Sequence, residues 1–220
     1  MYREMNKENI RYNYIVIEGN IGAGKTTLAS MIANEYNAKL ILERFADNPF
    51  LPKFYEDPAR FSFPLELSFL ADRYRQLKEE LMEQDLFKCF TVADYYFMKS
   101  LVFASSTLEP DEYNLYRQIF YIIYGSLPKP DLYVYLHVTP ERLLENIAQR
   151  GREYEKSITA GYLTGIQESY FTFFRQNPDN RYLILDIKDI DFVKRPEDYR
   201  KLTKTIFDED IQMGINLRNF

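Results

Sequence analysis

The chain of 220 residues has no tryptophan, one cysteine and one histidine. A single cysteine, Cys89, cannot form a disulfide within the chain, which fits the reducing cytoplasm. We therefore expect a cytoplasmic protein. The only histidine, His137, lies in the apolar run "LYVYLHV", where a buried strand position explains it better than a role as general base.

Long hydrophobic runs are also absent. No apolar stretch approaches the roughly 20 residues that a helix needs to cross a bilayer. The first residues, "MYREMNKENIRYN", are polar and charged, so we expect no signal peptide. We therefore expect no membrane partner.

Positive charge is not in excess, because 33 Asp and Glu outnumber 28 Lys and Arg and leave a net charge of −5. Proteins that bind nucleic acids usually carry a basic surface, so we expect no nucleic-acid partner. Aromatic residues are abundant, at 16% of the chain. Most belong in a core, and some could line a pocket for a flat ligand.

The chain shows no repeat and no low-complexity linker, so residues 1–220 are expected to form one domain with peripheral tails at 1–12 and 208–220. Short apolar runs alternate with segments of helical spacing. This alternation predicts an α/β fold with a five-stranded parallel sheet flanked by helices and joined by right-handed crossovers. The expected strands are residues 12–19, 38–43, 88–94, 130–138 and 181–187.

The clearest motif is "GNIGAGKT", which matches G-x-x-x-x-G-K-[ST] between an expected strand and an expected helix. The glycines let backbone N–H groups face nucleotide phosphates, the lysine adds a mobile positive charge, and the threonine hydroxyl can bind Mg²⁺. The expected nucleotide-binding residues are Gly19, Asn20, Ile21, Gly22, Ala23, Gly24, Lys25, Thr26 and Thr27.

Several classes of protein share this loop. A GTPase switch needs a guanine-reading N-K-x-D segment, which the sequence lacks, and large motors or transporters need a longer chain. The size suits a small kinase, which must cover its phosphates with a cationic lid. In "QRGREYEKSI", Arg150 and Arg152 flank Gly151 and could neutralise charge on a transferring phosphoryl group. The alternative is a solvated charge cluster at a helix end.

Two carboxylates end expected strands, at the edge of the sheet where α/β proteins bind ligands. Glu43 could accept a proton from a substrate hydroxyl that attacks a γ-phosphate. Asp94, together with Thr26, could hold Mg²⁺. The alternatives are a surface charge or helix cap for Glu43, and a helix cap for Asp94.

Together these motifs resemble the deoxynucleoside kinase family, and within it the bacterial deoxyguanosine/deoxyadenosine kinases. The resemblance runs from about Tyr14 to Tyr199 and rests on "EGNIGAGKTTLA", "NPFLPKFYEDP", "FSFPLELSFLADRYRQL", "ADYYFMKSLVFASSTL", "LPKPDLYVYL" and "QRGREYEKSI". It implies a P-loop NTPase fold with a short Arg-rich lid. It also implies ATP and Mg²⁺ as cofactors, the 5′-hydroxyl of a deoxynucleoside as acceptor, and a homodimer built through helices.

The resemblance also implies roles for single residues. Glu43 matches the family's catalytic base, and Phe103 matches a ring that stacks on the base of the nucleoside. Tyr55 and Glu155 match a pair that contacts the sugar 3′-hydroxyl and would leave little room for a ribose 2′-hydroxyl. The expected catalytic residues are Glu43, Lys25, Arg150 and Arg152.

Two positions depart from the family's usual pattern. Asp94 matches the acid of an acid-Arg-Ser motif, but Tyr95 follows where the arginine is common. Lys99 or a lid arginine would then have to steady Glu43. The bacterial deoxyguanosine-kinase-like branch is similar in carrying Asp-Tyr here, so we infer no loss of activity from Tyr95. The second departure is Glu66, where many members have a glutamine.

Glu66 carries information about the base. It shares a helix face with Arg73, seven residues later. A carboxylate only accepts hydrogen bonds, which suits the N1 and N2 donors of guanine, and an arginine fork suits its O6 and N7. Adenine, with an acceptor at N1 and a donor at N6, suits glutamine better. A mismatch costs about 1–3 kcal/mol for each unpaired group, so deoxyguanosine is the expected substrate.

Other interpretations remain open from the sequence. Glu66 and Arg73 could pair with each other and read nothing, or Glu66 could accept adenine by protonation or by swinging aside. A nucleoside monophosphate kinase would share the loop and lid but would need more cations on the acceptor side. A nucleotide-binding regulatory protein that has lost catalysis is the other alternative, and Tyr95 is its best support.

Overall fold

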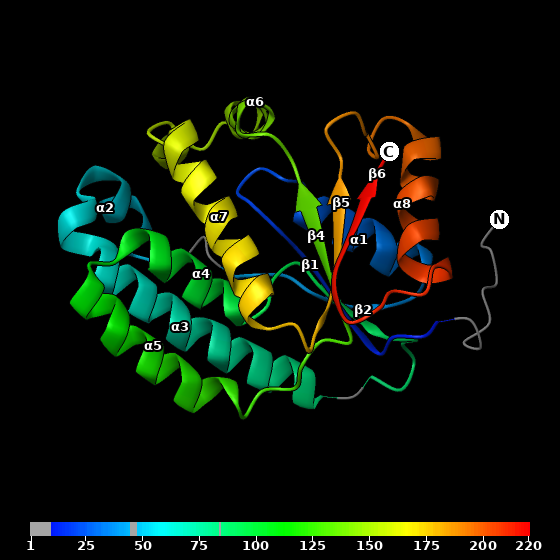
Figure 1. Ribbon diagram of the computed structural model, residues 1–220, viewed down its shortest axis with the longest axis horizontal. Coiled ribbons are helices and arrows are strands. Elements are labelled where there is room, and N and C mark those ends of the chain that lie inside the picture. Colours follow the sequence, from blue (N-terminus) through cyan, green and yellow to red (C-terminus); the bar gives the residue numbers. More distant parts are fainter. Residues whose placement is uncertain (1–9, 45–47, 84) are drawn as a thin grey trace.

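The computed structural model describes residues 10–44, 48–83 and 85–220. Its centre is a parallel sheet with the strand order β2-β3-β1-β4-β5-β6, drawn edge-on in Figure 1. The predicted α/β fold is confirmed. The strands are β1 (Tyr14–Gly19), β2 (Lys39–Ile41), β3 (Thr91–Ala93), β4 (Leu132–His137), β5 (Arg181–Asp186) and β6 (Gly214–Asn219).

The predicted number of five strands is wrong, because the sheet has six. The additional strand, β6, lies within the expected tail 208–220 and pairs in parallel with β5. Apolar and polar residues alternate along β6, but with the apolar side chains outward: Ile215 and Leu217 are exposed, whereas Asn216 and Arg218 are half-buried. Polar side chains turn inward because they have partners, and Arg218 pairs with Glu209 at 2.7 Å. A hydrophobic pattern could not find such an edge strand.

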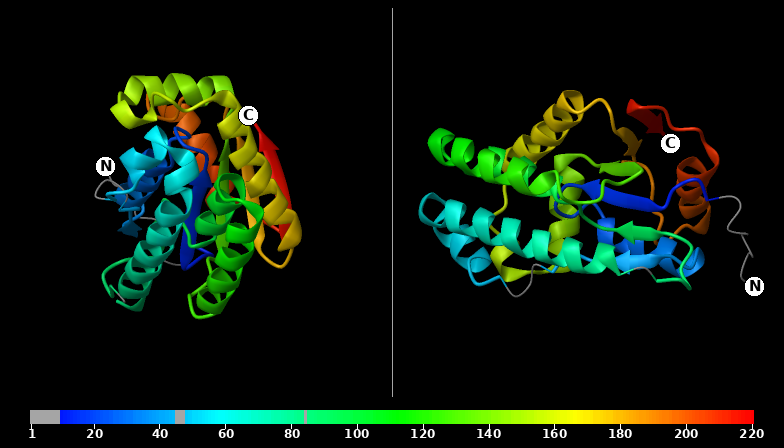
Figure 2. Two further views of the ribbon diagram at one scale, coloured as in Figure 1. Left: turned by 90° about the vertical axis from the view of Figure 1, so that its left-hand side faces the viewer. Right: turned by 90° about the horizontal axis from the view of Figure 1, so that it is seen from below.

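The helices connect successive strands and cover both faces of the sheet. They are α1 (Lys25–Glu35), α2 (Leu51–Glu56), α3 (Pro58–Met82), α4 (Met98–Thr107), α5 (Pro110–Tyr124), α6 (Pro140–Arg150), α7 (Ala160–Gln176) and α8 (Pro196–Asp208), with a 3₁₀ turn η2 (Glu153–Glu155). Figures 1 and 2 show α3, α4, α5 and α7 on one face and α1 and α8 on the other. Among the described residues, no helix is long and apolar enough to cross a membrane.

Alternate residues of β1 serve two separate cores. Ile15 and Ile17 join the buried cluster that contains Leu28 of α1 and Ile206 of α8. Tyr14 and Val16 point to the opposite face, because successive side chains of a strand alternate. Their cluster includes the helix residues Leu70, Val102, Phe120 and Phe174. This double packing fixes the sheet between its helices and aligns the carboxyl ends of the strands.

Local signals set the helix ends nearest those strand ends. Thr139 caps α6 by accepting a hydrogen bond from the Arg142 backbone N–H, and Pro140 occupies the first helical turn. The helix stops at Gly151, whose φ of 71° is left-handed. The chain therefore turns sharply between Arg150 and Arg152. Gly24, with φ of 88°, similarly starts α1 directly after the phosphate-binding motif.

Candidate active site

The loop between β1 and α1 needs glycine at two positions. Gly22 and Gly24 have φ of 82° and 88°, in the region that side chains disfavour. A Cβ atom on Gly22 would lie 2.9 Å from the carbonyl oxygen of Leu143, and one on Gly24 would lie 3.0 Å from the Phe192 ring. The glycines therefore allow the curl of the loop and its close contacts with α6 and with Phe192 after β5.

Side chains from other elements hold this loop in shape. The amide nitrogen of Asn20 donates to the Leu163 carbonyl at 2.7 Å, and that of Asn146 donates to the Gly22 carbonyl at 2.8 Å. Lys25 Nζ donates to the Asn20 carbonyl at 2.8 Å. The ammonium group of Lys25 therefore lies back over the loop, where phosphates would bind.

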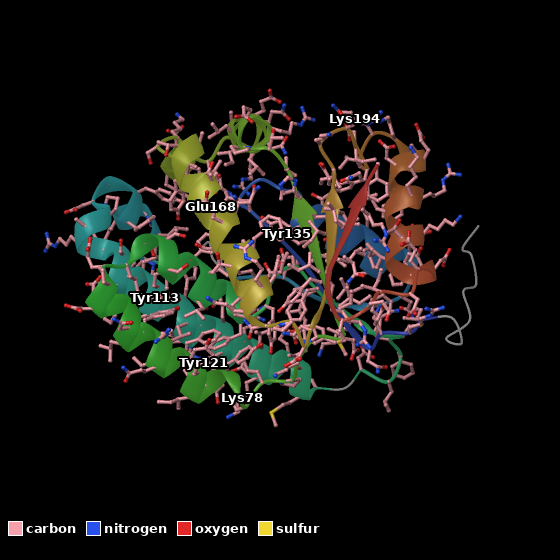
Figure 3. The ribbon with its side chains drawn as sticks, in the orientation of Figure 1. Lys78, Tyr113, Tyr121, Tyr135, Glu168 and Lys194 are labelled. Atoms are coloured by element: carbon pink, nitrogen blue, oxygen red, sulfur yellow. The ribbon has the colours of Figure 1, made fainter. Side chains whose placement is uncertain are left out.

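A cavity above the loop fits a nucleotide. The loop, α6 and the segment after β5 enclose it, and Lys194 marks that segment in Figure 3. Cationic side chains, loop N–H groups and an apolar wall meet there, as a nucleoside triphosphate requires. The lining includes Gly22, Ala23, Gly24, Lys25, Thr26, Thr27, Arg142, Arg150, Arg152, Ile190 and Phe192.

Thr26, Glu43 and Asp94 meet beyond the ends of three neighbouring strands. Asp94 accepts a hydrogen bond from the Glu43 backbone N–H at 2.8 Å and one from the Thr26 hydroxyl at 2.5 Å. Hydroxyl and carboxylate oxygens suit Mg²⁺. Across the described chain, no three His, Cys, Asp or Glu residues cluster as a metal site. The two side chains therefore fit a magnesium ion that takes its other ligands from phosphates and water.

Glu43 lies between two cations. Both Nε and Nη2 of Arg73 are 2.8 Å from Glu43 Oε1, and Lys99 Nζ pairs with Oε2. Burial raises the pKa of Glu43, but the charges of Lys99 and Arg73 outweigh burial and lower it to about 2. The carboxylate is therefore ionised at neutral pH and held in one orientation, as a proton acceptor must be.

Lys99 pairs with Glu43, the contact that an arginine at position 95 was expected to make in other family members. Tyr95 is fully buried, and its hydroxyl has no hydrogen-bond partner among residues 10–44, 48–83 and 85–220. It therefore makes no contact with Glu43 of the kind that an arginine would make. Lys99 does so from the first turn of α4.

Glu66 lies deep in the site, with 2% of its surface exposed. Its Oε1 accepts a hydrogen bond from the Thr107 hydroxyl at 3.0 Å, while Oε2 has no partner in the described part of the chain. Burial raises the pKa of Glu66 to about 7, and Arg73, Thr107 and Lys99 oppose this rise only in part. One oxygen is therefore anchored and the other is free.

Among the described side chains, Arg73 forms no hydrogen bond with Glu66. The structure therefore does not show the alternative in which these two residues pair with each other. The Nε and Nη2 atoms of Arg73 contact Glu43, and its Nη1 donates to Ser100 Oγ at 2.9 Å. A guanidinium has five N–H donors. Each terminal nitrogen of Arg73 therefore keeps one further N–H.

The lid forms a compact cluster around Glu155, which is 5% exposed. Arg150 Nη2 lies 2.6 Å from both Glu155 oxygens, and Arg152 Nη1 lies 3.4 Å from Oε1. Tyr154 stacks on Tyr55 of α2 with ring centroids 5.8 Å apart. The lid thus contacts α2, and it brings the two residues expected at the sugar close to the arginines.

A second cavity collects the residues expected on the acceptor side. Its lining includes Ile21, Lys25, Thr26, Glu43, Tyr55, Glu66, Phe69, Arg73, Asp94, Lys99, Phe103, Arg150, Arg152, Tyr154, Glu155 and Tyr162. Lys25, Thr26 and the two lid arginines line both cavities. The two cavities therefore meet where a phosphoryl group would pass from one ligand to the other.

Sequence reasoning missed several residues of this site, among them Ser100, Thr107 and Tyr154. A helical spacing could have found Thr107, because Lys99, Phe103 and Thr107 recur every four residues and share a face of α4. Tyr154 follows the lid arginines without any motif of its own.

Glu18 was also missed. It is fully buried at the end of β1, and it accepts hydrogen bonds from the Tyr96 backbone N–H and the Tyr170 hydroxyl, each at 2.8 Å. Burial raises the pKa of Glu18, against the charges of Lys99 and Lys25. Glu18 ties the start of the loop to the turn before α4 and to α7.

Comparison with known proteins agrees with this geometry. A family model described as "Deoxynucleoside kinase" matches residues 15–212. Deoxyguanosine kinase of Bacillus subtilis (strain 168) is 38% identical over 194 residues, which are 86% of this chain and 93% of that protein. Deoxyadenosine kinase of Dictyostelium discoideum is 31% identical over 208 residues, which are 92% of this chain and 82% of that protein.

A solved structure of deoxyadenosine kinase from M. mycoides, with dCMP and a flexible dCDP bound, has the same fold. It superposes with a TM-score of 0.77 over 89% of this chain and 100% of that chain, at 22% sequence identity. Of the two relatives described above, one is named for deoxyguanosine and the other for deoxyadenosine. Sequence similarity alone therefore does not indicate which of the two bases this chain prefers.

Proposed function

The chain belongs to the deoxynucleoside kinase family, and from that premise we propose that it phosphorylates purine deoxynucleosides and prefers deoxyguanosine to deoxyadenosine. Deoxynucleoside kinases use ATP as phosphate donor with Mg²⁺. Family membership argues against a nucleoside monophosphate kinase. A regulatory protein without catalysis is not supported either, because Lys99 contacts Glu43 where Tyr95 does not.

On the donor side, we assign the phosphates to the loop between β1 and α1. The loop N–H groups and Lys25 would bind the β- and γ-phosphates, and Thr26 and Asp94 would hold Mg²⁺, which would neutralise phosphate charge when bound. Arg150 and Arg152 line both cavities and stabilise charge on the group in transfer.

On the acceptor side, we assign Glu43 as general base. Its carboxylate takes the proton of the 5′-hydroxyl as that oxygen bonds to the γ-phosphorus and the bond to the β-phosphate oxygen breaks. Tyr55 and Glu155 contact the 3′-hydroxyl, and Phe103 stacks on the base. All four residues line the acceptor cavity, which supports this assignment.

The preference for deoxyguanosine rests on one observation, the free Oε2 of the buried Glu66. An ionised carboxylate accepts both hydrogen bonds that the N1 and N2 groups of guanine donate. The remaining N–H groups of Arg73, on the same face of α3, suit the guanine acceptors O6 and N7. Adenine would leave an acceptor facing this carboxylate.

Replacement of Glu66 by glutamine tests the preference. An amide can donate to N1 of adenine and accept from its N6, so Glu66→Gln is expected to shift the ratio of kcat/KM for deoxyguanosine over deoxyadenosine toward deoxyadenosine. One mispaired buried group corresponds to about a 5- to 150-fold change. The measurement is a competition assay with both nucleosides in one reaction at about pH 8.

The matched control is Glu79→Gln on the same helix, where the side chain is exposed. It removes the same charge from α3 and is expected to leave the ratio unchanged. An unaltered ratio in Glu66→Gln would refute the proposed reading of guanine.

We further propose a homodimer and a cytoplasmic location. Exposed apolar side chains along α5, including Leu115 and Ile122, support the first. The single, half-buried cysteine, Cys89, fits the second.

A further inference from the structure

The contact between Glu66 and Thr107 does not depend on whether Glu66 is ionised. The Thr107 hydroxyl lies 3.0 Å from Glu66 Oε1 and 3.0 Å from the carbonyl oxygen of Phe103. A hydroxyl has one proton and two lone pairs. It can donate to Oε1 of an ionised Glu66, and it can also donate to Oε1 of a neutral Glu66 that carries its proton on Oε2, because Oε1 keeps its lone pairs in both states.

The two states of Glu66 offer different partners to a base. When Glu66 is ionised, Oε2 only accepts, which suits the donors N1 and N2 of guanine. When the proton is on Oε2, the hydroxyl can donate to N1 of adenine, while Oε1 keeps a lone pair for the N6 amino group beside its bond to Thr107. The neutral carboxyl thus complements adenine as the carboxylate complements guanine.

We propose that Glu66 reads both purines, guanine as a carboxylate and adenine as a carboxylic acid, so that its proton decides which deoxynucleoside is phosphorylated. Thr107 is the positioning residue that holds Oε1 in either state. This inference rests on the proposed function, because it requires Glu66 to face the base.

Charged groups around Glu66 act on its proton in opposite directions. Arg73 from α3 and Lys99 from α4 favour the ionised form, while Glu43 opposes it. Tyrosines from three further helices face Glu66 as well: Tyr55 from α2, Tyr116 from α5 and Tyr162 from α7.

Neither cation is committed to Glu66, because Arg73 and Lys99 both contact Glu43 directly. With burial as the largest cause, the pKa of Glu66 rises to about 7. Both protonation states are therefore accessible near neutral pH.

The proposal predicts the pH dependence of a ratio. If each purine uses only one state of Glu66, kcat/KM for deoxyguanosine follows the ionised fraction and that for deoxyadenosine follows the protonated fraction. Their ratio then rises about tenfold for each pH unit, whatever the pKa. Other groups affect both substrates alike, because the transfer to the 5′-hydroxyl is shared, so they cancel in the ratio.

The first experiment measures this ratio by competition at several values between about pH 6 and pH 8.5. We expect a rise of up to about tenfold per unit in the wild-type protein, and a flat profile in Glu66→Gln, whose amide does not titrate. A flat wild-type profile, together with a shifted ratio in Glu66→Gln, would overturn this inference and leave the proposed function standing. A ratio that Glu66→Gln does not shift would overturn both.

The second experiment substitutes Thr107. Thr107→Val removes the donor to ionised Oε1, so the carboxylate is less favoured and the ratio should move about tenfold toward deoxyadenosine at every pH. Thr107→Ser keeps the hydroxyl and should restore the wild-type ratio. An equal shift in both variants would show that any change of the Thr107 side chain alters the ratio, and would count against the hydroxyl as positioning group.

The third experiment detects the proton directly. Calorimetric titration in two buffers of different ionisation enthalpy counts the protons exchanged on binding. Above the pKa of Glu66, binding of deoxyadenosine should be accompanied by uptake of a proton by the protein. Below that pKa, binding of deoxyguanosine should be accompanied by release of a proton. Both exchanges should vanish in Glu66→Gln. Binding of both nucleosides without proton exchange in the wild-type protein would contradict the inference.

Discussion

Glu43 illustrates how single residues carry the chemistry of this site. Its side chain is 9% exposed, and two cations, Arg73 and Lys99, contact it. They keep it ionised and fix its direction. The sequence placed Glu43 after a strand and left Lys99 or a lid arginine to steady it. It did not show which of these would contact Glu43, or that Arg73 would, because Lys99 arrives from α4 and Arg73 from α3.

We expect Glu43→Gln to reduce turnover by about 10²- to 10⁴-fold, because glutamine cannot accept the proton of the 5′-hydroxyl. Nucleoside binding should largely survive, because Tyr55, Glu66 and Phe103 remain. Steady-state turnover and a calorimetric Kd measure the two effects separately. The exposed Glu141→Gln on α6 serves as control. Unchanged turnover in Glu43→Gln would rule out its role as base.

At the scale of elements, the loop after β1 depends on its fit against α6. We expect Gly22→Ala to raise the KM for ATP by about tenfold or more, because its Cβ would lie 2.9 Å from the Leu143 carbonyl oxygen at a φ of 82°. Binding of the nucleoside alone should change little. Kinetics at varied ATP and a nucleoside Kd without ATP test this.

The matched control is Gly165→Ala in α7, where a Cβ would meet nothing within 4 Å. Alanine in a helix interior is favoured over glycine by about 0.5–1 kcal/mol, so this variant should be slightly more stable and fully active. An unchanged KM for ATP in Gly22→Ala would contradict the close fit of the loop.

Glu18 links three elements and makes stability depend on pH. Its folded pKa is raised, mainly by burial, whereas an unfolded glutamate titrates near about 4.3. Between these values the folded protein binds more protons than the unfolded chain, so the free energy of unfolding falls as pH rises. We therefore expect Tm to decrease from about pH 5 to about pH 8.

Glu18→Gln should weaken this decrease, because the amide oxygen still accepts from the Tyr96 N–H and no charge is buried. Glu66 contributes a slope of the same sign, so the decrease should not vanish. Glu43, whose pKa is lowered, acts only at more acid pH. Melting curves of the wild-type protein and of Glu18→Gln over this pH range test the prediction. An identical slope of Tm against pH in both proteins would refute the contribution of Glu18.

At the scale of the whole molecule, an exposed apolar stripe on α5 bears on assembly. Leu115 and Ile122 on α5 are 51% and 82% exposed, and with the half-buried Ile119 they form a stripe of helical spacing. Figure 3 shows the neighbouring Tyr121 on the same helix, away from the carboxyl ends of the strands. A second copy packed on this stripe would leave both active sites open.

Sedimentation equilibrium is expected to give about twice the chain mass of 26.3 kDa. Ile122→Glu should yield a monomer, because a buried unpaired charge opposes association. Met213 is an exposed apolar residue just before the edge strand β6, and Met213→Glu should leave the mass unchanged. A wild-type monomer would refute the proposed homodimer.

The sequence by itself determined the local chemistry. Gly22 and Gly24, Lys25 and the strand-ending Glu43 and Asp94 could be predicted because backbone freedom, charge and the carboxyl ends of strands are properties of short segments. The parallel α/β fold followed from the alternation of strands and helices. The resemblance added Tyr55, Phe103 and Glu155, which no local pattern marks.

Only the tertiary structure decided which side chains meet. Arg73 turns to Glu43 and Ser100, Thr107 anchors one oxygen of Glu66, and β6 presents its polar side chains inward. Each outcome depends on groups from separate elements competing for the same buried partner. A buried charge takes whichever partner the packing brings within reach, and the spacing of residues in one segment does not contain that information.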